Sequence, residues 1–136
     1  MYLRRRIPYV DDSSLINLAV STFNIESTMF RNILKRANEV IVICNNDDEI
    51  IGFLCYRFVL KDIVFIEFVI LDRNYQGKGI AHSFLPDMIK YANKQGIKGV
   101  FGYVSKNNSK ALKIFEGWGF RQIINSSNGI LIGRHI

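Results

Sequence analysis

The sequence has few cysteines and histidines, no long apolar run and no apolar block near its N-terminus. These absences argue against a metal-binding, a membrane-spanning and a secreted protein. The chain has only two cysteines and two histidines, and neither type shows the paired spacing of a metal site. No apolar run approaches the ~20 residues that a membrane-spanning helix needs. The basic N-terminal residues precede no long apolar block, so we expect no secretory signal. We therefore expect a cytoplasmic protein without metal or membrane association, in which Cys44 and Cys55 are buried, reduced thiols.

What is present is enough for one globular domain. The 136 residues are 49% hydrophobic and 22% charged, so residues 1–136 can form a single core without disulfides. The net charge is +6, but the charges are scattered, and Arg4–Arg6 is the only tight cluster. This scatter favours a solvated basic surface over a nucleic-acid groove, with Arg4–Arg6 decorating a first strand. A monomer and a homodimer, the latter through the C-terminal strands, both fit the sequence.

Hydrophobic periodicity predicts most of the elements. Residues 11–23 and 25–39 are typical of two amphipathic helices, the first opening with N-capping residues that begin at Asp11. Residues 40–44 and 50–60 flank a polar turn and indicate a β-hairpin. The inward faces of the two helices are predicted as Leu15, Ile16, Ala19, Val20 and Phe23, then Met29, Phe30, Ile33, Leu34 and Ala37.

The rest of the chain alternates between strands and helices. The near-continuous apolar run at 63–71 predicts a central strand covered on both faces. A strand–helix–strand unit implies parallel pairing and the hairpins imply antiparallel pairing. We therefore predict an α/β (α+β) fold with a mixed, mostly antiparallel sheet of about six or seven strands and helices on both faces. The later elements are a helix at 77–96 kinked at Pro86, a strand at 97–104, a helix at 107–118, and strands at 120–125 and 129–136.

The segment "LDRNYQGKGIA", residues 71–81, has the features of an anion site. Gly77 and Gly79 allow a sharp turn and a close backbone approach, and unpaired N–H groups follow at the start of a helix. Lys78 adds a positive charge. The segment lacks the Ser/Thr after the lysine of a Walker motif and the third glycine of a dinucleotide-binding motif. A glycine-rich turn without any ligand is the alternative.

Two motifs together resemble the GNAT superfamily of acyl-CoA-dependent N-acyltransferases. "QGKGIA" is similar to its Gln/Arg-x-x-Gly-x-Gly/Ala signature. "NNSKALKIFEGWGF" resembles its second signature, Asn-x-x-Ala-x-x-aromatic followed by Gly-Phe, here Gly119 and Phe120. The motifs stand in the right order with a strand between them. The resemblance covers essentially the whole chain, although the N-terminal third matches only in the order of its elements.

The resemblance implies a GNAT-like sheet and a coenzyme A site. The backbone of Val69 and Leu71 would pair with the pantetheine arm of acetyl-CoA. Asn108 would hydrogen-bond near the thiol, although it could instead cap the helix, or Asn107 could do so. The CoA pyrophosphate would be held by the backbone N–H groups of Gln76, Gly77, Lys78, Gly79, Ile80 and Ala81.

The reaction implied is direct attack of an amine on the thioester in a ternary complex. The amine must first lose a proton, and Glu67 is the leading candidate base because it is a lone carboxylate in an apolar strand. By strand alternation, Glu67 shares a face with Val69 and Leu71. The competing interpretation is an ion pair with a neighbour in the sheet such as Arg57. The acceptor is a small-molecule or peptide amine that no motif identifies.

Phe115 stands where the family often has a tyrosine that protonates the departing thiolate. Phenylalanine has no proton to give. Water or Tyr103 on the neighbouring strand could replace the missing acid. The sequence therefore allows two functions, an active N-acetyltransferase or a catalytically weak or inactive acyl-CoA-binding and regulatory module.

Overall fold

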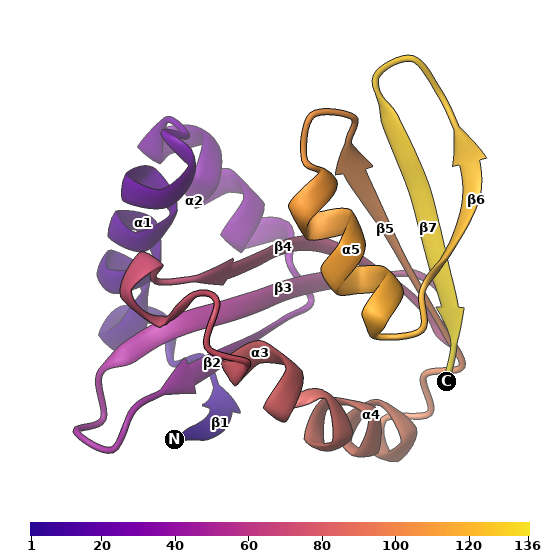
Figure 1. The fold of residues 1–136 in the computed structure, drawn as a ribbon. Helices are drawn as coiled ribbons and strands as arrows, with labels where there is room; N and C mark the ends of the chain where they lie inside the picture. Colours follow the sequence, from indigo (N-terminus) through magenta and orange to yellow (C-terminus); the bar gives the residue numbers. More distant parts are fainter. The chain divides into compact units, whose positions relative to one another are not determined.

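The computed structural model describes all residues, 1–136. In chain order it contains β1 (Tyr2–Arg5), α1 (Pro8–Phe23), α2 (Ser27–Arg36), β2 (Glu39–Cys44), β3 (Ile50–Leu60), β4 (Ile63–Leu71), the 3-10 helix η1 (Arg73–Tyr75), α3 (Ile80–Ser83), α4 (Leu85–Lys94), β5 (Gly99–Ser105), α5 (Ser109–Gly117), β6 (Arg121–Asn125) and β7 (Gly129–His135) (Figure 1). None of the helices combines the length and the apolar character that a membrane crossing requires.

The strands pair in the order β1-β2-β3-β4-β5-β7-β6. Among the pairings with a defined register, only β4 with β5 is parallel, and the others are antiparallel. The predicted mixed, mostly antiparallel sheet is confirmed. The hairpin around 45–49 and the bounds of β4 are also as predicted.

The chain divides into two compact units. The first comprises Met1–Arg57 and Glu67–Ile80, and the second comprises Phe58–Ile66 and Ala81–Ile136. The first unit contains β1, α1, α2, β2, most of β3 and the second half of β4. The second contains α4, β5, α5, β6 and β7, with the β3–β4 turn.

Aromatic rings form the centre of the first unit. Phe30 of α2 is fully buried, and its ring centroid lies 5.6 Å from that of Phe53 in β3 and 5.2 Å from that of Phe68 in β4. Phe23, at the end of α1, packs on Phe68 at 6.0 Å although it is 48% exposed. The Phe30–Phe68 contact is edge-on and the other two are tilted, and aromatic contacts of both kinds add to the hydrophobic gain of burial. The rings therefore hold α2 against the strand that carries the candidate base.

Several predicted apolar positions are less buried than expected. Leu15, Ile16 and Ala19 lie in the core, but Val20 is 37% exposed and Met29 is 56% exposed. The prediction that these last two face inward is wrong. An apolar residue at the margin of a helical face often stays accessible, because apolar atoms make up much of every protein surface. The prediction that β4 is covered on both faces also fails, since most of its side chains are only half-buried.

Pro86 breaks the predicted helix at 77–96 into two. Phe84 separates α3 from α4, and Pro86 is the second residue of α4, where its missing N–H costs nothing. α4 ends at Lys94, and Gly96 follows with φ +74°, as a C-terminal glycine should.

The cysteines behave as the sequence predicts. Both are buried and free, and Cys55 pairs across the hairpin with Val40 and not with Cys44. Burial raises the pKa of the Cys55 thiol to about 12. The Cys55 thiol is therefore protonated and unreactive in the folded protein.

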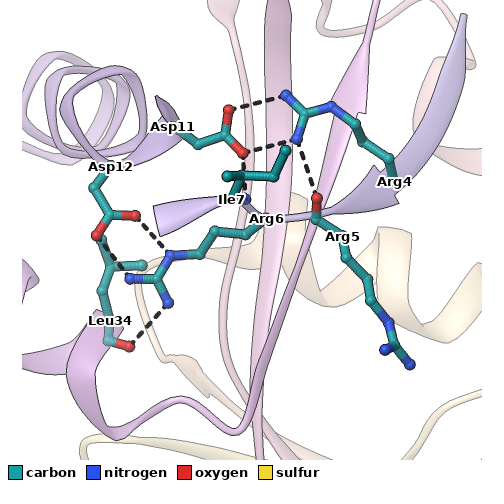
Figure 2. A network of polar contacts seen from close by, with 7 residues as sticks. All are labelled: Arg4, Arg5, Arg6, Ile7, Asp11, Asp12 and Leu34. Atoms are coloured by element: carbon teal, nitrogen blue, oxygen red, sulfur yellow. Dashed lines mark hydrogen bonds and ion pairs between the residues drawn. The ribbon is translucent and has the colours of Figure 1, made fainter. Parts of the chain in front are cut away.

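The arginines of the N-terminal cluster form a network that the sequence did not predict (Figure 2). Arg4 donates to both carboxylate oxygens of Asp11, at 2.7 and 2.9 Å. Arg6 does the same with Asp12, at 2.6 and 2.7 Å, and its third nitrogen donates to the Leu34 carbonyl at 3.3 Å. Arg4 and Arg5 lie in the first strand, as the sequence predicts. The bonds of Arg4 and Arg6 also join this part of the chain to α1 and to the last turn of α2.

Asp11 does not begin its helix. α1 starts three residues earlier, with Pro8 at its first position, and Asp11 reaches back to accept a hydrogen bond from the Ile7 N–H at 2.7 Å. The side chain of Asp11 is only 2% exposed. A buried carboxylate requires partners, and Arg4 and Ile7 supply them. Periodicity placed the helix correctly, but a contact with β1 decided where it begins.

Replacing Asp11 by asparagine should destabilise the fold. Arg4 would lose a bidentate partner in a part-buried site, so we expect the free energy of unfolding at pH 7 to fall by about 2–3 kcal/mol. Chemical denaturation measures this change. Asp47→Asn, at the exposed tip of the β2–β3 hairpin, is the matched control and should change it little.

The effect of Asp11→Asn should depend on pH. Hydrogen bonds from Arg4 lower the pKa of Asp11 below its ordinary value. In the unfolded chain the carboxylate takes up a proton first, near pH ~4, so its stabilising contribution is complete above that pH and is lost as the pH falls through the folded-state pKa. The difference between wild type and Asp11→Asn should therefore shrink below about pH 4. An unchanged difference at pH 3 would contradict this account.

Candidate active site

β4 carries the residues that the sequence singled out in the first unit. Phe68 and Ile70 turn toward the aromatic core, and Ile70 is 1% exposed. Glu67, Val69 and Leu71 alternate with them and occupy the opposite face of the strand. The predicted common face of these three residues follows from this alternation.

Glu67 is held by two arginines. Its side chain is only 9% exposed, and Arg57 of β3 places Nε 3.1 Å from Oε1 while Arg36 of α2 donates from Nη2 to Oε2 at 3.3 Å. The ion pair with Arg57, offered by the sequence as an alternative to catalysis, is therefore present. However, the direction of the Arg57 contact is unsuitable for a hydrogen bond, and the buried Oε1 atom accepts none. Oε1 is close to positive charge but retains lone pairs for another donor.

Arg36 is the residue that sequence reasoning missed at this position. It lies in the last turn of α2, 31 positions before Glu67, and its side chain is 65% exposed. A basic residue near a helix C-terminus is common, because it interacts favourably with the helix dipole. No local pattern could have revealed its contact with β4. The contact arises from the packing of α2 on β4 through Phe30 and Phe68.

The loop after β4 is organised by its own side chains. Asp72 accepts a hydrogen bond from the Asn74 N–H at 2.9 Å and so caps η1, and Gln76 Nε2 donates to the Leu71 carbonyl at 2.8 Å. Arg73 ties η1 to the Ser21 carbonyl of α1. These bonds fix the entry into the glycine segment.

Both glycines of the loop use conformations that other residues rarely adopt. Gly77 and Gly79 each have φ +73°, and no atom lies within 4 Å of the point where a Cβ would stand on either. Lys78, between them, is exposed. The loop therefore offers open backbone in a left-handed conformation, which is the type of surface that an anion can approach closely.

The helix that follows the loop is shorter than the sequence predicts. α3 has only four residues before Phe84 interrupts it. So short a helix contributes little dipole. Any anion bound here would depend on the local N–H groups and on Lys78 more than on a helix dipole.

Asn108 caps α5 in the second unit. Its Oδ1 accepts a hydrogen bond from the Ala111 N–H at 3.2 Å, and it is the N-cap residue of the helix. Of the alternatives raised by the sequence, Asn108 and not Asn107 therefore fills the capping role. The bond uses Oδ1 only, so the NH₂ group of the side chain retains its donors.

Phe115 belongs to an aromatic cluster. Its ring stands edge-on to Trp118 and Phe120, with centroid distances of 5.5 and 5.3 Å. Trp118 and Phe120 are buried, whereas Phe115 is half-buried. The ring of Phe115 thus has a role in packing that does not depend on a hydroxyl group.

Tyr103 of β5 has its hydroxyl directed to the β6–β7 turn. The oxygen lies 3.5 Å from Ser126 Oγ, and the ring covers Gly129, where an added Cβ would stand 2.5 Å from the tyrosine Cζ. The residue is 50% exposed.

The structure groups the predicted site residues by unit. Glu67, Val69, Leu71 and the loop up to Ile80 belong to the first unit, and Ala81 begins the second. Tyr103, Asn108 and Phe115 also belong to the second unit. No three His, Cys, Asp or Glu residues gather in a way that could hold a metal ion.

Comparisons of the sequence and of the fold with known proteins all find acetyltransferases. The sequence profile of the Acetyltransferase (GNAT) family matches residues 13–120. The histone acetyltransferase MCC1 of Arabidopsis thaliana is 28% identical over 110 residues, which cover 67% of this chain and 44% of that protein. The chain therefore spans less than half the length of this relative.

Two solved structures share the fold over nearly the whole chain. A GNAT family acetyltransferase from Elizabethkingia anophelis with acetyl-CoA bound has a TM-score of 0.76 at 17% identity, covering 99% of this chain and 97% of that one. The PaiA N-acetyltransferase of Thermoplasma acidophilum in complex with coenzyme A has a TM-score of 0.78 at 17% identity, covering all of both chains. At this identity, the two structures show a common fold.

Proposed function

Because the chain belongs to the GNAT family of acetyltransferases, we propose that it transfers an acetyl group from acetyl-CoA to a primary amine by direct attack in a ternary complex. Acetyl-CoA and CoA are the ligands bound in the two structures of the same fold. The observation that carries the proposal is the buried Glu67 Oε1, which accepts no hydrogen bond and lies on the same face of β4 as Val69 and Leu71.

The loop has the features that a pyrophosphate needs. Backbone N–H groups from Gln76 to Ala81 would donate to its oxygens, and Lys78 would add charge. The open space at Gly77 and Gly79 fits a ligand that comes close to the main chain. Val69 and Leu71 lie beyond the pairs of β4 with β5, which end at Ile66. Their backbone N–H and C=O groups would form hydrogen bonds with the amides of the pantetheine arm, as a sheet edge does with an added strand.

Glu67 would act as the general base. An acceptor ammonium would donate to Oε1 and lose one proton to the carboxylate. The neutral nitrogen then attacks the thioester carbon and a C–N bond forms. The nitrogen, now positively charged, loses its second proton to solvent as the C–S bond breaks. The electron pair of the C–S bond leaves with sulfur as the CoA thiolate. The proton passes from Glu67 to solvent or to the thiolate.

The departing thiolate needs less assistance than most leaving groups, because it is only a weak base, with a conjugate thiol whose ordinary pKa is about 8.5. Phe115 cannot protonate it. The hydroxyl of the half-exposed Tyr103, or water, would do so, and the NH₂ group of Asn108 would bind CoA near its sulfur.

The alternative is a catalytically weak acyl-CoA-binding module. The contacts of Phe115 with Trp118 and Phe120 favour this alternative, because packing alone explains an aromatic residue at this position. Release of free thiol from acetyl-CoA in the presence of a panel of amines separates the two functions. Tight binding of CoA without turnover of any amine would select the binding module.

The variant Gly79→Val should abolish CoA binding. A side chain at this position would fill the space that the pyrophosphate requires, so we expect the dissociation constant measured by calorimetry to rise at least about a hundredfold. Gly96→Val is the matched control, because Gly96 has φ +74° and equally open surroundings but lies at the end of α4. Equal affinity in the two variants would refute the assignment of the loop.

The variant Glu67→Gln should lower kcat. Removing a positioned general base costs typically 10²- to 10⁴-fold, and we expect a loss in this range with CoA affinity unchanged. Steady-state thiol release and calorimetry measure the two quantities. A kcat within about threefold of wild type would exclude the role of Glu67 as base.

The variant Phe115→Tyr tests the missing acid. Tyrosine can keep the edge-on contacts with Trp118 and Phe120 while adding a proton donor. If thiolate protonation limits the rate, kcat should rise, by roughly tenfold or more. Tyr103→Phe in the same assay shows whether the native Tyr103 hydroxyl protonates the thiolate. If it does, removing this hydroxyl should lower kcat by a similar factor. If neither change alters kcat, water is the proton donor.

A further inference from the structure

Glu67 has two positively charged neighbours. Two guanidinium groups, from Arg36 and Arg57, contact one carboxylate. Their side chains are 65% and 44% exposed, whereas that of Glu67 is 9% exposed. The site thus presents a recessed negative charge and two positive charges that reach solvent.

Stability of the fold does not explain this arrangement. Exposed ion pairs contribute about 0–1 kcal/mol, and one carboxylate can be neutralised by one arginine. Two guanidinium groups near the same carboxylate also repel each other. Arg36 uses one N–H group, in a single 3.3 Å bond to Glu67, so its other N–H groups point to no partner. The remaining N–H groups of Arg36 are suited to an anion that comes from outside.

We propose that the acceptor is an amine that carries a carboxylate, as a free amino acid does. Its ammonium group would donate to Glu67 Oε1, the buried oxygen without a hydrogen bond. Its carboxylate would be bound by Arg36, with Arg57 adding charge. Guanidinium groups match carboxylates in geometry and can bind them with two parallel hydrogen bonds. The inference rests on the proposed function, because it takes Glu67 as the place where the amine binds.

The same charges disfavour other acceptors. A polyamine or a lysine-rich peptide would bring further positive charge beside Arg36 and Arg57, and like charges brought together weaken binding. An amine that lacks a carboxylate would leave the remaining N–H groups of Arg36 without an anion to bind. The site therefore selects its acceptor in two ways: it attracts a carboxylate and repels additional positive charge.

The test compares amines that differ in a single charge. Common amino acids, each paired with its own carboxamide, are assayed as acceptors with acetyl-CoA, together with spermidine and a lysine-rich peptide. We expect kcat/KM to favour the carboxylate over its carboxamide by roughly ten- to a hundredfold. The variant Arg36→Gln should remove most of this preference. Arg31→Gln, at an exposed position on the same helix, should retain it.

A binding measurement separates this inference from the proposed activity. Calorimetric titration of the amino acids into the protein with CoA present should give a dissociation constant that rises in Arg36→Gln and not in Arg31→Gln. Binding that depends on Arg36 without any turnover would support the acceptor class and contradict catalysis. Turnover of carboxamides or polyamines as fast as carboxylates, or a preference unaffected by Arg36→Gln, would overturn the inference while leaving acetyl transfer intact.

Discussion

The alternation of side chains along β4 is the constraint on which the first unit depends. Phe68 and Ile70 enter the core, so Glu67 must lie on the other face. A shift of one residue in register would bury a carboxylate among phenylalanine rings and expose the core, at a free-energy cost far greater than that of any single contact. One pattern therefore fixes the packing of α2 on the strand and the position of the candidate base.

The packing of α2 has a second consequence. Phe30 anchors the helix on Phe53 and Phe68, and Arg6 binds the Leu34 carbonyl near the end of the helix. Arg36 follows in the same last turn, so its reach to Glu67 depends on both contacts. The N-terminal network of arginines and aspartates thus helps to position the helix that carries Arg36, although none of the residues in the network touches Glu67.

Residue 115 illustrates how one position can serve packing and chemistry. The edge-on contacts with Trp118 and Phe120 require a ring and are indifferent to a hydroxyl. The departure from the usual tyrosine therefore leaves the local structure intact and changes only the available proton donors. In the same way, Asn108 caps α5 with its oxygen, and this bond does not use the NH₂ group of the side chain.

The sequence by itself determined the strands, the β2–β3 hairpin and the glycine loop, because these depend on period-two alternation, turn chemistry and short motifs that local neighbours express. The break at Pro86 was equally local. Only the tertiary structure decided that Asp11 lies inside a helix paired with Arg4, and that Arg36 joins Arg57 at Glu67. Such ion pairs connect residues on different elements, and a charged residue on a helix has the same pattern whether it faces water or a distant strand.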